Sequence, residues 1–167
     1  LDHAGGIRRL LETTDVGDVI ASTQGLAELT DVRCVAGLGW RSAGVAFRVL
    51  HPKAESPWTG NNASCVLAIS TGEKTILLPG DIEKPVEQLM THRRELPKSE
   101  VVVVPHHGSR TSSSDDLVAA TRPAIAIVSA GWRNRWGFPK PDVLRRWQQA
   151  DTRVLNTATD GAVSMRL

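Results

Sequence analysis

Four consecutive β-branched residues at 101–104 (Val-Val-Val-Val) constrain the fold more than any other stretch of the sequence. β-Branched side chains favour strands, and a strand without alternating polar residues is buried on both faces. Fully buried strands of this kind occur in sheets that are covered by helices. We therefore expect residues 101–104 to lie inside a sheet with helices packed against it.

The rest of the chain alternates short apolar runs with helical patterns. Apolar residues recur at helical spacing after Gly5-Gly6 and across residues 82–93, where Pro85 falls in the first turn. The turn residues 71–73 separate two apolar runs and predict a hairpin. Further strands are expected at 19–20, 32–35, 45–50 and 124–128, further helices at 115–121 and 141–150, and a final strand pair at 153–155 and 162–167. This order predicts an α/β fold with sheets covered by helices.

Composition limits the possible classes of protein. The chain has 167 residues, 41% of them hydrophobic and 23% charged, which suits one packed domain or one domain lacking a piece. The net charge of +2 is too small to indicate a nucleic-acid binder by itself, so any anion site must be local. No stretch approaches the roughly 20 apolar residues of a membrane span. The start at Leu1, without an initiator Met or a signal peptide, indicates a fragment boundary.

The two cysteines, Cys34 and Cys65, do not form a CxxC pair, and neither lies near a histidine at the spacing of zinc ligands. Two interpretations stay open from the residues alone. The cysteines are either ordinary buried thiols or the two halves of one disulfide in an oxidising compartment.

Polar residues gather at three points where elements begin or end. Asp2 and His3 precede two glycines at the entrance to the first helix, and Asp81 follows a buried strand and Gly80. Either carboxylate can face a cation, and either can instead cap the helix that follows it. His106 and His107 leave the apolar run at 101–104 and lead directly into a glycine. A histidine pair in this place indicates function.

Together these clusters supply a ligand set of carboxylates and imidazoles without a thiolate, which suits hard or borderline divalent cations. Carboxylates shared by two divalent cations hold them about 3.5–4 Å apart and position a hydroxide nucleophile. Hydrolysis of phosphodiesters and esters at neutral pH needs such a nucleophile. The residues therefore point to a metal-dependent hydrolase.

The order of these motifs resembles the metallo-β-lactamase superfamily. Residues 2–6 are similar to the second half of its His-x-His/Asp-x-Asp-His-x-Gly-Gly signature, residues 78–81 to its bridging-aspartate motif, and residues 105–109 to its late histidine motif. Within the superfamily, the chain resembles the domain found in ComEC-type competence proteins from residue 1 to about 165. The stretches that carry this closer resemblance are 33–37, 44–52, 61–67, 78–83, 105–114 and 129–135.

The resemblance implies an αββα sandwich with the metal site at one edge, spanning residues 1–167 as a single domain. The first strand and the first half of the opening motif would precede residue 1. The implied activity is that of a divalent-metal nuclease that degrades the non-imported strand of DNA during natural transformation. The implied cofactors are two divalent metal ions, Mn²⁺ ahead of Zn²⁺. The implied partners are single-stranded DNA and the rest of a transmembrane DNA-uptake channel, and the implied location is extracytoplasmic.

Two alternatives to a nuclease stay open. The same scaffold supports an esterase or a small-molecule phosphodiesterase. A degenerate, non-catalytic module that binds DNA or braces a membrane channel is the other alternative. Phe138 and Asn62 favour the degenerate module, because the resemblance implies a histidine at each of these positions in many relatives.

Carried over residue by residue, the resemblance implies that Asp2, His3, Asp81 and His107 bind metal. Asp2, Asp81 and His106 are the implied catalytic residues, with His106 orienting a ligand or the substrate. Asn62 stands where many members carry a metal-binding histidine, so that site would be weaker or supplied by oxygen. We expect Asn62 to contact substrate.

A loop that mixes aromatic and cationic residues is the expected contact for single-stranded DNA, because bases stack on rings while cations follow the phosphates. Its members are Arg133, Asn134, Arg135 and Trp136. The alternative is that Trp132 and Trp136 anchor a long loop and the arginines are solvated.

Ser109 and Arg110 open a serine-rich segment that suits a phosphate oxygen beside the metals. Its last serine, Ser114, is expected to cap the helix that begins at Asp115.

Overall fold

The computed structural model describes residues 5–22 and 32–166, so Asp2 and His3 lie outside the described residues. The described residues form a seven-stranded sheet in the order β3-β4-β5-β6-β7-β8-β9 and a separate two-stranded sheet, β1-β2. The strands of the larger sheet are β3 Gly39–Ser42, β4 Val45–His51, β5 Val66–Ser70, β6 Thr75–Leu78, β7 Val101–Val103, β8 Ile125–Val128 and β9 Arg153–Asn156. The sheet is antiparallel from β3 to β6 and parallel from β6 to β9.

The all-valine run forms β7, at the middle of the parallel half of the sheet. Val101 pairs with Ile76 of β6 on one side and with Ile125 of β8 on the other. Val101, Val102 and Val104 are buried. Because the carboxyl ends of parallel strands meet at one edge, β6, β7 and β8 deliver the residues that follow them to the same place.

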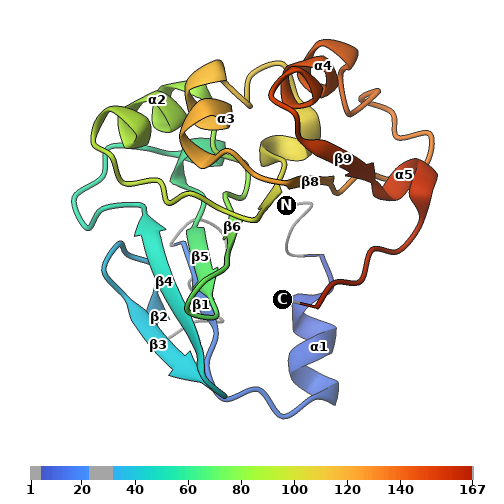
Figure 1. Cartoon of the computed structure of the whole chain (residues 1–167). Helices are drawn as coiled ribbons and strands as arrows, with labels where there is room; N and C mark the ends of the chain where they lie inside the picture. The colour runs from blue at the N-terminus through green and yellow to red at the C-terminus, as the bar shows by residue number, and fades with distance from the viewer. Residues whose placement is uncertain (1–4, 23–31, 167) are drawn as a thin grey trace.

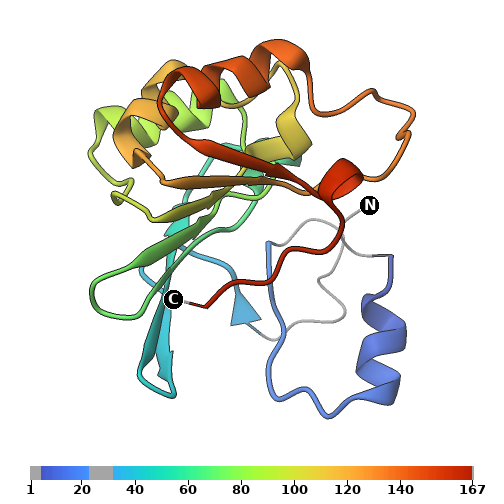
Figure 2. The ribbon, with the colours of Figure 1, turned by 45° about the vertical axis from the view of Figure 1, so that its right-hand side comes forward.

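Helices cover one face of this sheet. They are α2 Lys84–His92, α3 Asp115–Thr121 and α4 Pro141–Gln149, and they lie together above the strands in Figures 1 and 2. Pro85 is in the first turn of α2, as expected. The interface between the helices and the sheet is apolar and contains Val66, Leu77, Ile82, Val86, Met90, Val102, Leu117, Val143 and Trp147.

On the other side of the sheet lie α1 Ile7–Thr13 and the parallel pair β1 Ile20–Ala21 and β2 Val32–Arg33 (Figure 2). They stand where the sandwich was expected to continue. A disulfide joins Cys34, directly after β2, to Cys65, directly before β5, with 6.1 Å between their Cα atoms. The structure thus selects the disulfide over two buried thiols and fixes the smaller sheet to the larger one.

Of the two strands expected at the C-terminal end, the first is confirmed and the second is wrong. Residues 153–156 form β9, but the described residues 162–166 are not a strand, and α5 Thr157–Asp160 follows β9 instead. Local side chains explain this turn, because Asn156 accepts a hydrogen bond from the N–H of Ala158, and Asp160 accepts one from the N–H of Asn156. Strand β3 was not expected at all, since its four residues are exposed and carry no apolar alternation.

A buried carboxyl group secures the segment that follows the histidine pair. Glu87 of α2 has no exposed surface, and its two oxygens accept hydrogen bonds of 2.6 Å from the N–H groups of Ser113 and Ser114. We expect Glu87→Ala to lower the free energy of unfolding by about 2–4 kcal/mol, because it leaves two buried donors without partners. Urea denaturation measures this change. Gln88→Ala, an exposed change in the same helix, is the matched control and should cost far less.

The same carboxyl predicts a pH dependence of stability. Burial raises the pKa of Glu87, and the hydrogen bonds from Ser114 and Ser113 oppose this rise without cancelling it. The folded state therefore holds the proton more tightly than the unfolded chain. The contribution of Glu87 is fully present below its ordinary pKa of about 4.3 and declines as the pH rises through the raised value. The stability difference between wild type and Glu87→Gln should shrink over that interval, whereas a constant difference would contradict the assignment.

Among the described residues, no helix combines the length and the apolar character needed to cross a bilayer.

Candidate metal centre

Asp81 is placed at the carboxyl edge of the sheet by a tight turn after β6. Gly80 adopts a left-handed conformation with φ of +61°, and a Cβ atom there would lie 2.9 Å from Cβ of Ser64. The hydroxyl of Ser64 accepts a hydrogen bond of 3.1 Å from the N–H of Asp81. Only glycine combines this conformation with this close approach, so Gly80 and Ser64 together fix where Asp81 lies.

Asp81 does not cap the following helix. Helix α2 begins at Lys84, its N-cap residue is Glu83, and no side chain accepts a hydrogen bond at that cap. The capping interpretation of Asp81 is therefore wrong. Its carboxylate lies instead near His107, almost entirely buried.

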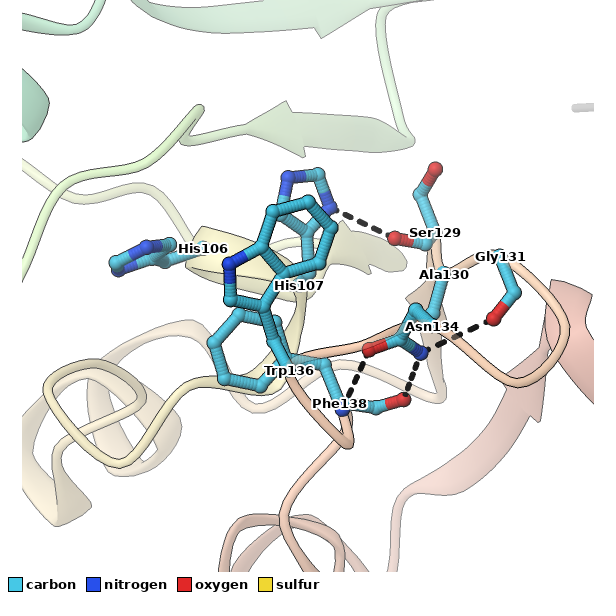
Figure 3. Close-up of a pocket in the computed structure, with 8 residues that line it drawn as sticks. All are labelled: His106, His107, Ser129, Ala130, Gly131, Asn134, Trp136 and Phe138. Carbon is cyan, nitrogen blue, oxygen red and sulfur yellow. Dashed lines mark hydrogen bonds between the residues drawn. The ribbon is translucent and has the colours of Figure 1, made fainter. Parts of the chain in front are cut away.

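The histidine pair has an uncommon backbone conformation. His106 and His107 both have positive φ values, 48° and 55°, within the turn Pro105–Gly108. Hydrogen bonds hold this turn, because the N–H of His106 donates to Gly80 and its carbonyl accepts from Ser109. Left-handed non-glycine residues cost free energy and gather at functional sites. The two rings leave the turn in different directions, with His107 toward Ser129 and His106 away from it (Figure 3).

His107 has the geometry of a metal-binding histidine. Its Nδ1 donates a hydrogen bond of 2.7 Å to the carbonyl of Ser129, because a carbonyl can only accept (Figure 3). Metal-binding histidines commonly fix their second ring nitrogen in this way. Nε2 lies 3.8 Å from Oδ1 of Asp81. That separation is shorter than two metal–ligand bonds of about 2.1 Å laid end to end, so one cation can touch both atoms.

The ring of His106 is held by a different set of partners. Its Nδ1 lies 3.2 Å from the hydroxyl of Thr111, which in turn donates to Glu83 at 2.8 Å. With this arrangement Nδ1–H donates to Thr111, and Nε2 accepts a weak hydrogen bond of 3.4 Å from the amide of Asn61. Both ring nitrogens of His106 are thus occupied by protein groups. The geometry favours His107 over His106 as the metal-binding member of the pair.

Glu83 and Thr111 were not among the expected site residues. Glu83 follows Asp81 by two residues and lies 3.4 Å from Nδ1 of His106, so it belongs to the same cluster. The sequence offered one signal, a second carboxylate in the motif at 78–83. Thr111 carried none, since its role depends on the fold of the 105–114 segment.

Asn62 braces the turn that carries these carboxylates. Its side-chain oxygen accepts a hydrogen bond of 2.9 Å from the N–H of Glu83, and its amide lies 3.5 Å from the Glu83 carboxylate. Buried His51 donates from Nε2 to the carbonyl of Asn62 at 2.8 Å. Burial lowers the pKa of His51, although this hydrogen bond opposes the effect, so the neutral ring is favoured. Through the hydrogen bond that its side-chain oxygen accepts, Asn62 positions Glu83.

The serine-rich segment has mainly structural contacts. Ser114 caps α3 by accepting from the N–H of Leu117, as expected. The hydroxyl of buried Ser109 bonds to Thr111, and Arg110 forms an exposed ion pair with Asp142 at 3.1 Å. Ser109 therefore lies beside Thr111, which contacts His106 and Glu83, and the side chain of Arg110 points toward α4.

The aromatic and cationic loop borders the histidines. Asn134 donates to the carbonyls of Gly131 and Phe138 and accepts from the N–H of Phe138, so it holds the loop closed (Figure 3). Trp132 is 69% exposed, so it is not an anchor for the loop, and Trp136 is 51% exposed. Guanidinium groups of Arg133 and Arg135 lie over the rings of Trp132 and Trp136.

Within the described part of the chain, no three histidine, cysteine, aspartate or glutamate side chains gather as a complete metal site. Two expected ligands, Asp81 and His107, do come together, and the other two, Asp2 and His3, fall outside the described residues. The pair offers one carboxylate oxygen and one imidazole nitrogen at a buried strand edge. This donor set fits a divalent cation.

Comparison with known proteins agrees with the geometry. The family model described as the metallo-beta-lactamase superfamily matches residues 1–132. The chain is 37% identical over 163 residues to Recombination protein 2 of Haemophilus influenzae, covering 97% of this chain and 20% of that protein. It is 38% identical over 120 residues to ComE operon protein 3 of Bacillus subtilis, and 31% identical over 167 residues to Competence protein ComA of Neisseria gonorrhoeae. These matches cover 72% and 99% of this chain, but only 16% and 24% of those two proteins.

Solved structures share the fold. The metallo-beta-lactamase fold protein YhfI from Bacillus subtilis aligns over 93% of this chain and 70% of its own, with a TM-score of 0.51 and 8% identity. A variant of the CmlA beta-hydroxylase aligns over 91% of this chain and 34% of its own, with a TM-score of 0.52 and 16% identity. The chain belongs to the metallo-β-lactamase superfamily, and its resemblance to part of the ComEC-type competence proteins is confirmed.

Proposed function

We propose that this chain is a metal-dependent phosphodiesterase that cuts DNA, and that it degrades the non-imported strand during DNA uptake. The observation that carries the proposal is the approach of His107 Nε2 to Asp81 Oδ1 at 3.8 Å, with His107 fixed through its Nδ1. Superfamily membership indicates a metal-dependent hydrolase, and the names of the relatives connect such a domain with competence. The specific substrate is our inference.

In this proposal Asp81 and His107 would hold divalent cations together with Asp2 and His3. Bound divalent cations would supply a hydroxide nucleophile at neutral pH and neutralise the developing charge on the phosphate. His106 acts from beside them. Its Nδ1 lies beside Thr111 and Glu83, which hold the ring in place so that it can orient a ligand or the substrate. We propose Mn²⁺ as the native metal, with Zn²⁺ as the alternative.

We further propose that residues 1–167 form one domain on the extracytoplasmic side of a DNA-uptake channel, with single-stranded DNA as its ligand. The Cys34–Cys65 disulfide supports this placement, because disulfides persist in oxidising compartments. The chain spans about a fifth of its competence-protein relatives, which leaves room in such proteins for a channel.

Cleavage of an end-labelled single-stranded oligonucleotide by the purified domain, prepared with the first half of the opening metal motif, tests this proposal. We expect cleavage with Mn²⁺ and complete loss of cleavage in EDTA, because the nucleophile depends on the metal. Thioester, lactone and small phosphodiester substrates should be turned over more slowly than DNA. A protein that is inert on DNA with every divalent metal tried, or that prefers small esters, would overturn the assignment.

A further inference from the structure

A pocket of about 280 Å³ opens beside the histidine pair. It is lined by His106 and His107, by the rings of Trp136 and Phe138, and by residues of the 129–134 segment (Figure 3). Ligand pockets range upward from about 300 Å³, so this one suits a single flat ring system and not a large organic molecule. Because His107 also faces Asp81, a ligand in the pocket lies next to the candidate metal centre.

Neighbouring groups hold the ring of Phe138 in the aromatic wall. Phe138 lies edge-on to His106 with 5.9 Å between ring centroids, and its plane is within 11° of the plane of Trp136. Behind Phe138, the chain is fixed by Gly108, where a Cβ atom would lie 2.6 Å from Pro139 and whose carbonyl accepts from the N–H of Lys140. The turn that holds the histidines and the segment that holds Phe138 are therefore locked together, and the ring stays in place without a ligand.

Two polar groups of the wall, the amide of Asn134 and the carbonyl of Ser129, already have hydrogen-bond partners within the protein. Both hydrogens of the Asn134 amide are taken by the carbonyls of Gly131 and Phe138. The carbonyl of Ser129 already accepts from His107. Stacking, by contrast, is available to every nucleobase, because every base has a π-face. The pocket is thus suited to base stacking that tolerates any sequence.

Positive charge lies at the mouth of the pocket. Residues 129–140 include Arg133, Arg135 and Lys140 and no aspartate or glutamate. Arg135 lies 4.4 Å above the ring of Trp136, and Lys140 donates to the carbonyl of Trp136. A strand whose base enters the pocket would therefore carry its phosphates near these cations.

We propose that this pocket is a base-binding subsite for single-stranded nucleic acid, in which one base stacks against Phe138 and Trp136 while its phosphate faces the metal centre. The inference rests on the proposed function and deepens it. It also gives Phe138 a role as a ring that binds substrate.

Binding in EDTA tests the subsite without cleavage. Fluorescence anisotropy compares a labelled oligothymidylate with an abasic strand of the same number of phosphates. We expect wild type to bind the base-bearing strand on the order of tenfold more tightly. Trp136→Ala and Phe138→Leu should lose most of this preference and leave the affinity for the abasic strand nearly unchanged. Phe138→Leu keeps an apolar wall and removes the π-face, so it separates stacking from simple filling of space.

Trp132→Ala is the matched control, because Trp132 is in the same loop and also contacts an arginine but does not line the pocket. It should retain the wild-type preference. Equal binding of the two strands by wild type, no measurable binding of either, or the same loss in Trp132→Ala as in Trp136→Ala would overturn the subsite. These outcomes are independent of cleavage: a protein that cuts DNA without a preference for bases refutes the subsite alone, and one that shows the preference without cutting refutes the phosphodiesterase alone.

Discussion

Asp81→Asn is expected to reduce DNA cleavage more than about a hundredfold, because even the partners that only orient metal ligands are worth about 10–100-fold. The substitution keeps the shape of the side chain and the N–H that bonds to Ser64, so the fold should survive. Cleavage of single-stranded DNA under saturating Mn²⁺, together with a thermal melt, measures both quantities.

Asp116→Ala is the control for this experiment, since Asp116 is an exposed carboxylate on α3. It should cleave DNA at the wild-type rate. If Asp81→Asn were as active as Asp116→Ala while both melted like wild type, Asp81 would not be part of the catalytic machinery.

The second large effect is expected on stability. Replacing both Cys34 and Cys65 with serine should lower the free energy of unfolding by about 3–4 kcal/mol, because the crosslink closes a loop across a sequence separation of 31. Urea denaturation with and without a reductant measures the difference. Wild type in reductant should unfold like the double variant, whose own midpoint should not respond to the reductant.

Reduction of the disulfide should also lower the rate of DNA cleavage, because Cys65 neighbours Ser64, which positions Asp81. A thiol count on the denatured, unreduced protein offers a direct check and should find no free thiol. Two free thiols per chain, or identical unfolding of wild type with and without reductant, would contradict the crosslink.

Much of the architecture could be predicted from two local signals: the apolar pattern of a segment and the residues that begin or end it. The run at 101–104 is β-branched throughout, and it forms the buried centre of the parallel strands. Helix α3 occupies residues 115–121 as expected, because Ser114 caps it and Pro123 follows it. Where the apolar pattern agrees with a residue that begins or ends an element, the local sequence is sufficient to predict that element.

Two stretches lack such an agreement of signals and were not predicted correctly. Strand β3 is exposed on all four residues and exists because β4 pairs with it. The described residues 162–166 form no strand, although an apolar pattern predicted one there. The short helix α5, which Asn156 and Asp160 stabilise through their own side chains, precedes them.

Some residues of the candidate site could be predicted from the sequence and others could not. Asp81 and the histidine pair stand out in the sequence because each follows a buried strand, and the structure brings Asp81 and His107 together. Glu83, Thr111 and the bracing role of Asn62 depend on how three separate segments meet. The exposure of Trp132 decides against one of the two alternatives that the sequence left open, namely that this ring anchors the loop.

The central claim is that Asp81 and His107 bind the same divalent cation, and calorimetric titration of the protein with Mn²⁺ tests it most directly. Asp81→Asn and His107→Ala should each weaken binding at least about tenfold. Because both side chains would act on one ion, the double variant should lose less than the product of the two single effects. Wild-type affinity for Mn²⁺ in either single variant would contradict the claim.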